Sequence, residues 1–461
     1  MGLECTDSLA VLDALTPEPG WETDLALFSS YSVDLVAVAA VVVALADEGD
    51  DHERLRDAPL ARACERMRDR FRVVCQAGRV AVPKSGTSAL VIADRWIREV
   101  RHDGNERSWH AKLALVRYRP TEAPDGEAEW RLWIGSRNLT RDTSWDSALT
   151  AVGRNSETSD SIDQSVAHAG RVLAARADLP GWSAADAEDE LLGLHWEWPE
   201  DMEVVSFDMW PDAQSAPRFP KAPSGLDHVV AVSPFVNSSI ARKLSNWGRR
   251  AANRQLLTTP ETLAALADRK RRSQLEHFTS LHQLDMSPGA DDADTDHQDD
   301  TGDDQMVEVH RGLHTKLLWA RSTAGDELWL GSANLTERAW NGRNTEGMVH
   351  ARVLPNVGEG LIGCLVNGLS TEVRQDDLVT ARPGEDPAEK ALDKLRNRIA
   401  ALWDARLEQD DASDTVRCET DSAPLHNHDA ASLSVRLLGQ TDWVQWKPRE
   451  TAVEFAATEL H

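Results

Sequence analysis

Apolar residues occur along the chain in short runs whose spacing predicts either strands or helices. Phe71–Gln76 and His228–Val232 are nearly continuous apolar runs, which predicts buried strands. Apolar residues at helical spacing predict helices over Ser88–Arg101 and Ser238–Ala252. Strands and helices alternate in both halves, which predicts an α/β protein with two similar layers. Further helices are predicted over Val33–Ala46, Arg54–Arg70, Ile162–Ala177, Ala184–Leu194, Pro260–Arg269 and Pro387–Leu407.

One polar pattern occurs twice, each time inside a pair of apolar runs. The first copy is HAKL (110–113) followed by WIGSRNLT (133–140), and the second is HTKL (314–317) followed by WLGSANLT (329–336). The histidine and the asparagine are 28 positions apart in the first copy and 20 in the second (138 − 110 and 334 − 314). The difference falls in the turn between two predicted strands, where insertions are tolerated.

These residue types together suit the chemistry of a phosphate diester. A histidine and a lysine two positions apart on a strand point to the same face, and the serine and asparagine reach that face across the hairpin. Two copies brought together supply one imidazole to attack phosphorus, another to transfer protons, and donors that stabilise negative charge. The candidate catalytic or binding residues are His110, Lys112, Ser136 and Asn138 in the first copy and His314, Lys316, Ser332 and Asn334 in the second.

The histidines of the sequence also have other interpretations. A histidine near a strand end is often an ordinary polar residue. Zinc binding is not predicted, because two histidines without cysteine or a spaced carboxylate are too few ligands, and lysine is a poor neighbour for a cation. His426–Asp429 resembles a fragment of a metal site, but it lies in a polar stretch and is interpreted as a solvated loop. We therefore expect neither a metal nor a cofactor.

At these residues the sequence resembles the phospholipase D superfamily, whose members carry two HxK motifs, each followed by a GSxN-type turn. The resemblance is specific at the two motifs and extends loosely over residues 25–375, including Ser233-Pro234-Phe235 and Gln255-Leu256-Leu257. It implies two α/β lobes with the site between them. It also implies a metal-independent reaction through a phosphohistidine intermediate.

The chain departs from the family pattern at two equivalent positions. Many members have an aspartate five residues after the lysine, whereas this chain has Arg117 and Arg321. This difference makes a lipid-specialised enzyme a poorer match. It brings the chain closer to the nuclease-like and tyrosyl-DNA phosphodiesterase-like branches of the family.

A carboxylate downstream of each motif completes the resemblance. Glu346 resembles the family's carboxylate that orients a catalytic histidine across the lobe interface, and Asp146 is the candidate for that place in the first copy. If Glu346 supports the histidine of the opposite lobe, the resemblance implies that His110 is the nucleophile and His314 the acid.

The net charge of −27, with 77 acidic against 50 basic residues, bears on the substrate. It opposes unselective binding to nucleic acid or to an anionic membrane, so DNA binding requires local basic patches. Adaptation to high salt or a compositional habit of the genome explains the charge equally well. Nine residues are lysines, and Lys112 and Lys316 are two of them, which suggests a role for a compact ammonium group.

Candidate basic patches lie near both motifs. Arg137, inside the first GSxN turn, is the strongest candidate for a substrate contact. For the two clusters on predicted helices, a solvated helix face is an equal alternative. The other candidates are Arg95, Arg98, Arg101, Arg107, Arg117, Arg119, Arg131 and Arg141 near the first motif, and in the second half Arg242, Lys243, Arg249, Arg250 and Arg254 around Trp247, with Arg269–Arg272.

Three domains are expected: a first lobe over 1–200, a second lobe over 201–378 with an acidic loop at 285–304, and a C-terminal helix with a β-rich appendage over 379–461. Five cysteines without a CxxC pair predict reduced thiols and a cytoplasmic protein. The longest apolar segment, Val33–Ala46, is short for a membrane span, so no membrane insertion is expected. A monomer with an internal pseudo-dimer is favoured.

The sequence thus predicts a phosphodiesterase that acts on DNA, as a nuclease or a DNA-end-processing enzyme in defence or repair. By resemblance alone, a helicase or another defence or repair enzyme is the expected partner. Two alternatives stay open. One is a phospholipid hydrolase or transferase, and the other is a catalytically inactive module that binds nucleic acid.

Overall fold

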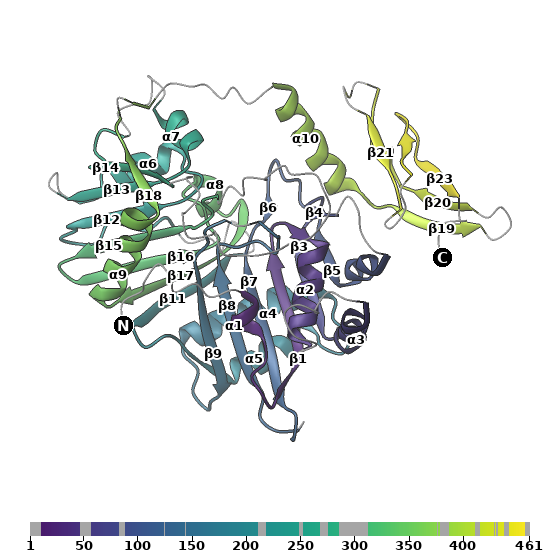
Figure 1. Cartoon of the computed structure of the whole chain (residues 1–461), viewed down its shortest axis with the longest axis horizontal. Helices are drawn as coiled ribbons and strands as arrows, with labels where there is room; N and C mark the ends of the chain where they lie inside the picture. Colours follow the sequence, from purple (N-terminus) through teal and green to yellow (C-terminus); the bar gives the residue numbers. More distant parts are fainter. Residues whose placement is uncertain are drawn as a thin grey trace, which may run out of the picture.

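In the computed structural model the chain folds into two α/β lobes and a smaller C-terminal part (Figure 1). The structure describes residues 11–46, 57–82, 88–123, 125–142, 144–210, 218–248, 252–267, 275–284, 312–375, 377–378, 387–410, 415–427, 429, 432–437 and 442–456. The acidic loop predicted at 285–304 and the basic residues Arg249, Arg250 and Arg269–Arg272 lie outside these residues.

The first lobe is built on a mixed sheet with the strand order β10-β9-β8-β7-β1-β3-β5. The pairs β1–β3 and β3–β5 are parallel, whereas the pairs from β1 through β7, β8 and β9 to β10 are antiparallel. The strands are β1 (Trp21–Ser30), β3 (Phe71–Gln76), β5 (Ile97–Val100), β7 (Leu113–Pro120), β8 (Glu129–Gly135), β9 (Ala148–Asn155) and β10 (Leu194–Glu197).

The second lobe repeats this plan with the order β11-β17-β16-β15-β12-β13-β14-β18. Again the middle strand starts a parallel series, β12–β13–β14, on one side and an antiparallel series on the other. The two halves of the sequence therefore form equivalent sheets. The strands are β11 (Met202–Trp210), β12 (His228–Val232), β13 (Asn253–Leu257), β14 (Ser280–Leu284), β15 (Leu317–Ser322), β16 (Gly325–Gly331), β17 (Asn344–Val353) and β18 (Ser370–Val373).

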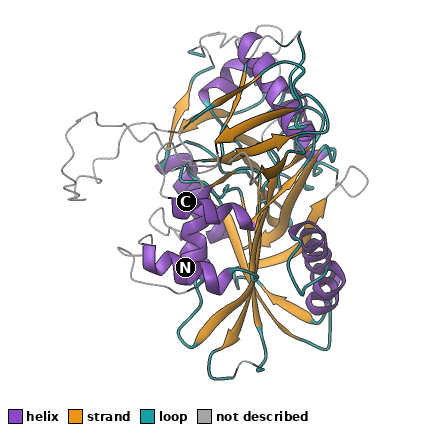
Figure 2. Cartoon of the chain, turned by 90° about the vertical axis from the view of Figure 1, so that its right-hand side faces the viewer, coloured by secondary structure: helices purple, strands orange, loops and turns teal. Residues whose placement is uncertain are grey.

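Helices cover both faces of the first sheet, as Figure 2 shows in the lower part of the view. For this reason every residue of β3 is buried, and the strand is a continuous apolar run rather than an alternating one. On one face lie α1 (Val11–Leu15), α2 (Leu35–Leu45) and α3 (Asp57–Met67), which share a core with the sheet. On the other face lie α4 (Ser161–Ala177) and α5 (Ala184–Leu192).

Helix α4 also joins the two lobes. It packs on β1 and β3 of the first sheet and on β11 of the second, and its side chains belong to a core that includes residues of both lobes. The outer face of the second sheet is covered by α6 (Ser238–Ser245), α7 (Pro260–Leu266) and α8 (Glu337–Trp340), and α9 (Pro355–Ile362) follows β17. The apolar packing of α4 on both sheets fixes the lobes against each other. Any site between the lobes requires this fixed arrangement.

Two equivalent helices begin directly after the central strands. Asp34, which ends the short strand β2 (Val33–Asp34), accepts a hydrogen bond from the Val36 amide and caps α2. Asn237 accepts one from the Ile240 amide and caps α6. The same strand, cap and helix unit therefore follows β1 and β12.

Three predicted helices were wrong in extent. Ser88–Arg101 forms a 3₁₀ helix over Ser88–Trp96 and then β5, because its end pairs with β3. The helix predicted over Ser238–Ala252 ends at Ser245. The one predicted over Pro387–Leu407 ends at Leu402, since Arg406–Asp410 joins a sheet. Local apolar spacing cannot show which residues a neighbouring strand will capture.

The C-terminal part consists of α10 (Pro387–Leu402) and small sheets with a core around Trp446. Asn397 of α10 is hydrogen-bonded to Arg79 (3.2 Å) and to Asn105 (3.3 Å) of the first lobe. The two α/β lobes, with this C-terminal helix and its small sheets, confirm the predicted fold class. The small sheets contain β19 (Arg406–Asp410), β20 (Thr415–Glu419), β21 (Leu433–Val435), β22 (Val444–Trp446) and β23 (Ala452–Ala456).

No helix within the described residues combines the length and the apolar character needed to cross a bilayer.

Candidate active site

Both HxK segments lie just before a strand, not on it as predicted. His110 and Lys112 lie between β6 (Ser108–Trp109) and β7, and His314 and Lys316 directly precede β15. Each segment is hydrogen-bonded to the other lobe. The His110 amide donates to Thr345 (2.9 Å), and the His314 amide donates to Trp145 (2.9 Å). The interface between the lobes therefore holds both histidines.

Glu346 of the second lobe holds His110 of the first. Its Oε2 atom is 2.9 Å from His110 Nδ1 and accepts a hydrogen bond from the Ser332 hydroxyl (2.5 Å). Its Oε1 atom accepts one from the Asn344 amide group (3.0 Å). Glu346 is fully buried, so this carboxylate has no solvent to compete with His110.

Asp146 of the first lobe holds His314 of the second in the mirrored arrangement. Its Oδ1 atom is 2.7 Å from His314 Nδ1 and accepts a hydrogen bond from the Ser136 hydroxyl (2.7 Å). Its Oδ2 atom accepts one from Arg137 (3.2 Å). Each lobe therefore supplies a histidine and the carboxylate for its partner lobe's histidine.

A glycine before each of these serines lets the chains approach closely enough. The amides of Ser136 and Ser332 donate to the carbonyls of Ser147 and Gly347, both at 2.9 Å. A Cβ atom at Gly331 would lie 2.2 Å from the Gly347 carbonyl oxygen, so no other residue fits there without a shift of backbone. This explains the glycine of each GSxN turn.

The two lysines are fully buried beside the histidines. Lys112 Nζ donates to the His110 carbonyl (2.9 Å) and lies 3.3 Å from His110 Nε2. Lys316 Nζ donates to the His314 carbonyl (2.6 Å). Burial lowers the pKa of Lys112 to about 8, although Glu346 and Asp146 raise it. Burial and the charge of Lys112 hold the pKa of Lys316 well below its usual value.

Burial also lowers the pKa values of both histidines. The pKa of His110 falls to about 4, because burial and Lys112 outweigh the opposing effect of Glu346. Burial lowers the pKa of His314, although the hydrogen bond that His314 donates to Asp146 raises it. Lys316 acts on His110, and Lys112 acts on His314, so the two sets share one electrostatic environment. Both imidazoles are therefore neutral at pH 7 without a bound anion.

The carboxylates fix the tautomer of each imidazole. Burial alone would raise the pKa of Glu346, but His110, Lys112 and Ser332 lower it overall. The same holds for Asp146, where His314 and Ser136 outweigh burial. An ionised carboxylate accepts a proton at Nδ1. Each Nε2 atom is then the nitrogen available for chemistry.

The two asparagines differ in their contacts with the residues at the ends of the central strands. The Ser233 hydroxyl oxygen accepts a hydrogen bond from the Leu335 amide (3.2 Å) and lies 3.4 Å from Asn334 Oδ1, which leaves the Asn334 amide group as the end for a substrate oxygen. Asn138 Oδ1 is buried and has no hydrogen-bond partner among the described residues. Ser30 accepts from the Leu139 amide (3.0 Å), as Ser233 does from Leu335.

Three predicted substrate contacts have other partners in the structure. The Ser136 and Ser332 hydroxyls hold Asp146 and Glu346, and Ser332 is fully buried. Arg137 binds Asp146 and also donates to the carbonyl oxygens of Thr140 (3.3 Å) and Asp142 (2.6 Å). These groups position the carboxylates, and their direct contact with substrate stays a prediction.

Sequence reasoning missed Ser30 and Tyr31. The Tyr31 ring lies 5.0 Å from the His110 ring, centroid to centroid, and 5.8 Å from Lys112 Nζ. Burial raises the pKa of Tyr31, which keeps the ring neutral. The only signal was positional: Ser30 is the last residue of β1, and Ser233 directly follows β12.

Several predicted phosphate contacts are engaged within the protein. Arg117 pairs with Asp24 (2.8 Å) and Glu190 (2.6 Å). Arg254 is buried and donates to the carbonyl of Trp247 (2.8 Å), itself a core residue. Basic residues in the sequence thus do not form the predicted patches at these positions. Arg119 pairs with Asp24, Arg131 with Glu18 and Glu129, Arg141 with Asp34, and Arg321 with Asp326 and Glu359.

Replacement of Arg117 by alanine should lower stability rather than catalysis. The side chains of Arg117, Asp24 and Glu190 are 14%, 22% and 29% exposed. Glu190 would lose its cationic partner and Asp24 would keep only Arg119, at a cost of about 1–3 kcal/mol in the free energy of unfolding. Urea denaturation with an unchanged m-value measures this. Arg352→Ala, which removes an exposed pair with Glu203, is the control and should cost less than about 1 kcal/mol. Unchanged stability with a reduced kcat/KM in Arg117→Ala would contradict the structural role.

Among the described residues, one group of possible metal ligands lies away from His110 and His314. It consists of Asp160, Asp163 and His195. Asp160 Oδ1 accepts from the Ile162 and Asp163 amides, and Asp163 accepts from the Asp160 and Trp196 amides. These carboxylates form the capping box of α4, and the helix N-terminus repels a cation. The group is therefore explained by helix capping.

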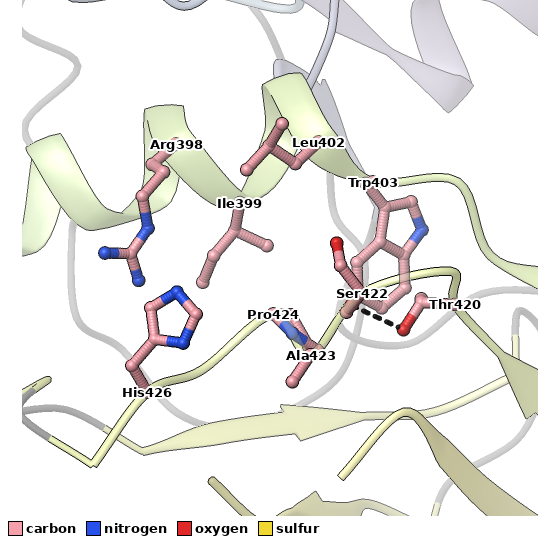
Figure 3. A pocket seen from close by; sticks show the side chains of 9 residues that line it. All are labelled: Arg398, Ile399, Leu402, Trp403, Thr420, Ser422, Ala423, Pro424 and His426. Carbon is pink, nitrogen blue, oxygen red and sulfur yellow. Dashed lines mark hydrogen bonds between the residues drawn. The ribbon is translucent and has the colours of Figure 1, made fainter. Parts of the chain in front are cut away.

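A cavity of about 20 Å³ lies between α10 and the C-terminal sheets (Figure 3). Arg398 and His426 line one end of it, and Trp403 lines the other. This volume holds about one water molecule. Arg398 pairs with Asp429 (2.6 Å), so Asp429 is tied to α10 and is not simply solvated.

No protein-family model and no curated protein matches the chain. A polyphosphate kinase from Porphyromonas gingivalis is similar at 13% identity and a TM-score of 0.38, over 83% of this chain and 50% of that one. A yeast tyrosyl-DNA phosphodiesterase is similar at 10% identity and 0.44, over 76% and 87%. A phosphatidylserine synthase from Haemophilus influenzae Rd KW20 is similar at 10% and 0.43, over 87% and 95%.

These three proteins are members of the phospholipase D superfamily, which the two motifs resemble. The chain spans half the length of the polyphosphate kinase. Each TM-score is below 0.5. The chemistry of the site is therefore inferred from its own side chains.

Proposed function

We propose that this chain is a metal-independent phosphodiesterase that acts on DNA, as a nuclease or a DNA-end-processing enzyme. The crossed pairs of His110 with Glu346 (2.9 Å) and His314 with Asp146 (2.7 Å) carry this proposal. Each pair holds the Nδ1 atom of one imidazole, which leaves its Nε2 atom for chemistry in a site that also contains the buried Lys112 and Lys316. The pKa values of four groups are lowered, so their protonated forms are costly in this site: His110, Lys112, His314 and Lys316. A bound phosphate anion would offset that cost.

In the first step His110 Nε2 attacks phosphorus. The P–N bond forms as the bond to the leaving oxygen breaks, and that oxygen takes the proton from Nε2 of protonated His314. Lys112, 3.3 Å from His110 Nε2, would lie beside the phosphoryl group. The lysines and the Asn334 amide group stabilise the charge that develops on the non-bridging oxygens.

In the second step water attacks the phosphorus of phosphohistidine 110. His314, now neutral, takes the proton from the water, and the P–N bond breaks to restore neutral His110. The carboxylates stay ionised in both steps. They stabilise whichever imidazole carries the positive charge, as an orienting aspartate does in a catalytic triad.

An asymmetry between the pairs supports these roles. The His110 side chain is 12% exposed and bound to a fully buried carboxylate, whereas His314 is 22% exposed and Asp146 is shared with Arg137. The low pKa of His110 keeps a neutral nucleophile down to about pH 4. The presence of a carboxylate no longer separates the two histidines, since each has one.

DNA as the substrate rests on the resemblance of the motifs to the nuclease-like branches of the phospholipase D superfamily. Purified protein should therefore cleave labelled single-stranded, double-stranded or 3′-adducted DNA. Phosphatidylcholine in the same experiment tests the alternative of a phospholipid hydrolase or transferase. Binding of DNA without cleavage, and without hydrolysis of the lipid, would favour the inactive binding module.

Cleavage should survive removal of divalent metal ions. The two imidazoles supply proton transfer and nucleophilic attack, and the lysines supply the charge stabilisation that a metal otherwise gives. The measurement is the rate in excess EDTA against the rate after dialysis into magnesium, manganese or zinc. We expect these two rates to differ by less than about twofold, which is too small a difference for the loss of a catalytic metal. Loss of activity in EDTA with recovery on metal addition would overturn this mechanism.

A further inference from the structure

An exposed aromatic side chain stands next to the candidate active site. Phe235 follows β12 and is 60% exposed, while Ser233 before it and Val236 after it are buried. Large apolar side chains in solvent are ordinary when scattered on mobile loops. This one lies on a segment that is fixed on both sides.

The fixing contacts of Phe235 come from several elements. Its carbonyl oxygen accepts a hydrogen bond from the Ser233 hydroxyl (2.9 Å). The carbonyl of Pro234 accepts from Thr262 (2.7 Å) and Thr259 (3.1 Å) of the α7 region. Val236 forms a bridge with Leu335, directly after Asn334. The backbone that carries the ring is therefore fixed in one place and has little entropy left to lose on binding.

The same hydroxyl ties Phe235 to the chemistry. Ser233 Oγ, whose proton goes to the Phe235 carbonyl (2.9 Å), also lies 3.4 Å from Asn334 Oδ1, so one hydroxyl group contacts both the Phe235 backbone and the Asn334 carboxamide. Lobe 1 has Ser32 at the equivalent position, after Ser30 and Tyr31. The exposed ring thus belongs to one side of the site alone.

We propose that Phe235 is a specificity-determining residue that stacks on an unpaired nucleobase next to the phosphate being cleaved. This inference rests on the proposed function, which it deepens by assigning the substrate class as single-stranded or frayed DNA. A base must leave its own stack before it can stack on a protein ring, and duplex DNA does not offer such an unstacked base. A ring face also binds bases without needing positive charge, which suits a chain of net charge −27.

Binding tests this without requiring catalysis. The dissociation constant is measured by fluorescence anisotropy for a labelled oligothymidylate, the same oligonucleotide with abasic sugars, and a blunt duplex. The variants are Phe235→Ala, Phe235→Leu and Phe235→Trp. Loss of one base stack should weaken oligothymidylate binding by about 5- to 150-fold in the alanine and leucine variants. Tryptophan should keep it, and binding of the abasic strand should not change.

Matched controls separate stacking from structure. Leu354 lies in the same lobe, is 50% exposed and follows the far end of β17, eight positions from Glu346. Leu354→Ala should bind all three probes as the wild type does. Equal binding of oligothymidylate by Phe235→Ala and wild type would overturn the proposal, and so would an equal loss for the abasic strand. Base-dependent binding in a wild type that cleaves nothing would support the stacking role and reject the phosphodiesterase.

Discussion

His110→Ala should abolish turnover and should form no covalent adduct with any substrate. His110 Nε2 is the nitrogen left free when Nδ1 is held by Glu346 at 2.9 Å, and alanine offers no nucleophile in its place. Loss of a nucleophile that acts within a catalytic unit costs on the order of 10⁵–10⁶ in kcat. The measurement is kcat on an aryl phosphodiester, together with intact mass after an acid-free quench.

His314→Ala should behave differently on the same substrate. An aryl leaving group needs little protonation, so the phosphohistidine should form and then accumulate, because nothing activates the incoming water. The adduct should appear in intact mass and disappear on acid treatment. An adduct in His110→Ala alone would reverse the two roles. Its absence from the wild type and from both variants would favour the binding module over the enzyme.

Glu346→Gln and Asp146→Asn should each reduce kcat/KM by about 10²–10⁴, as loss of the orienting carboxylate does in catalytic triads. Each change removes the charge that stabilises an imidazolium while leaving a side chain of the same shape. Glu346 is 2.9 Å from His110, and Asp146 is 2.7 Å from His314. The two substitutions should therefore act on different limbs of the pH profile.

The direction of each shift follows from the pKa values. In the wild type, kcat/KM should rise as His110 loses its proton at about pH 4, and fall as His314 loses its proton below its usual 6.5. Glu346 raises the pKa of His110, so Glu346→Gln should move the acid limb to lower pH. Asp146 raises the pKa of His314, so Asp146→Asn should move the alkaline limb to still lower pH.

A remote carboxylate provides the control for these profiles. Glu203 is 70% exposed and pairs with Arg352, so Glu203→Gln changes the net charge by the same amount without touching either histidine. Its profile should match the wild type. Identical profiles for Glu346→Gln, Asp146→Asn and Glu203→Gln would contradict the crossed pairing.

The sequence by itself determined the repeated unit and its chemical groups. The period-two and helical spacings are local properties, and so are the HxK and GSxN segments that end or precede strands. For this reason the α/β class, the two lobes and the candidate residues were predictable. The glycine of each GSxN turn was visible as well, although its reason, a carbonyl 2.2 Å from a Cβ atom at Gly331, was not.

Only the tertiary structure decided which groups meet. His110 and Glu346 are 236 positions apart and His314 and Asp146 are 168 apart, so their pairing depends on how α4 and the shared core set one lobe against the other. Within each lobe, the folding of the strands turned Ser136 and Ser332 toward the carboxylates and paired Arg117 with Asp24. A charged residue in a sequence can face substrate or a buried partner, and the surrounding lobes decide between them through the cost of burying an unpaired charge.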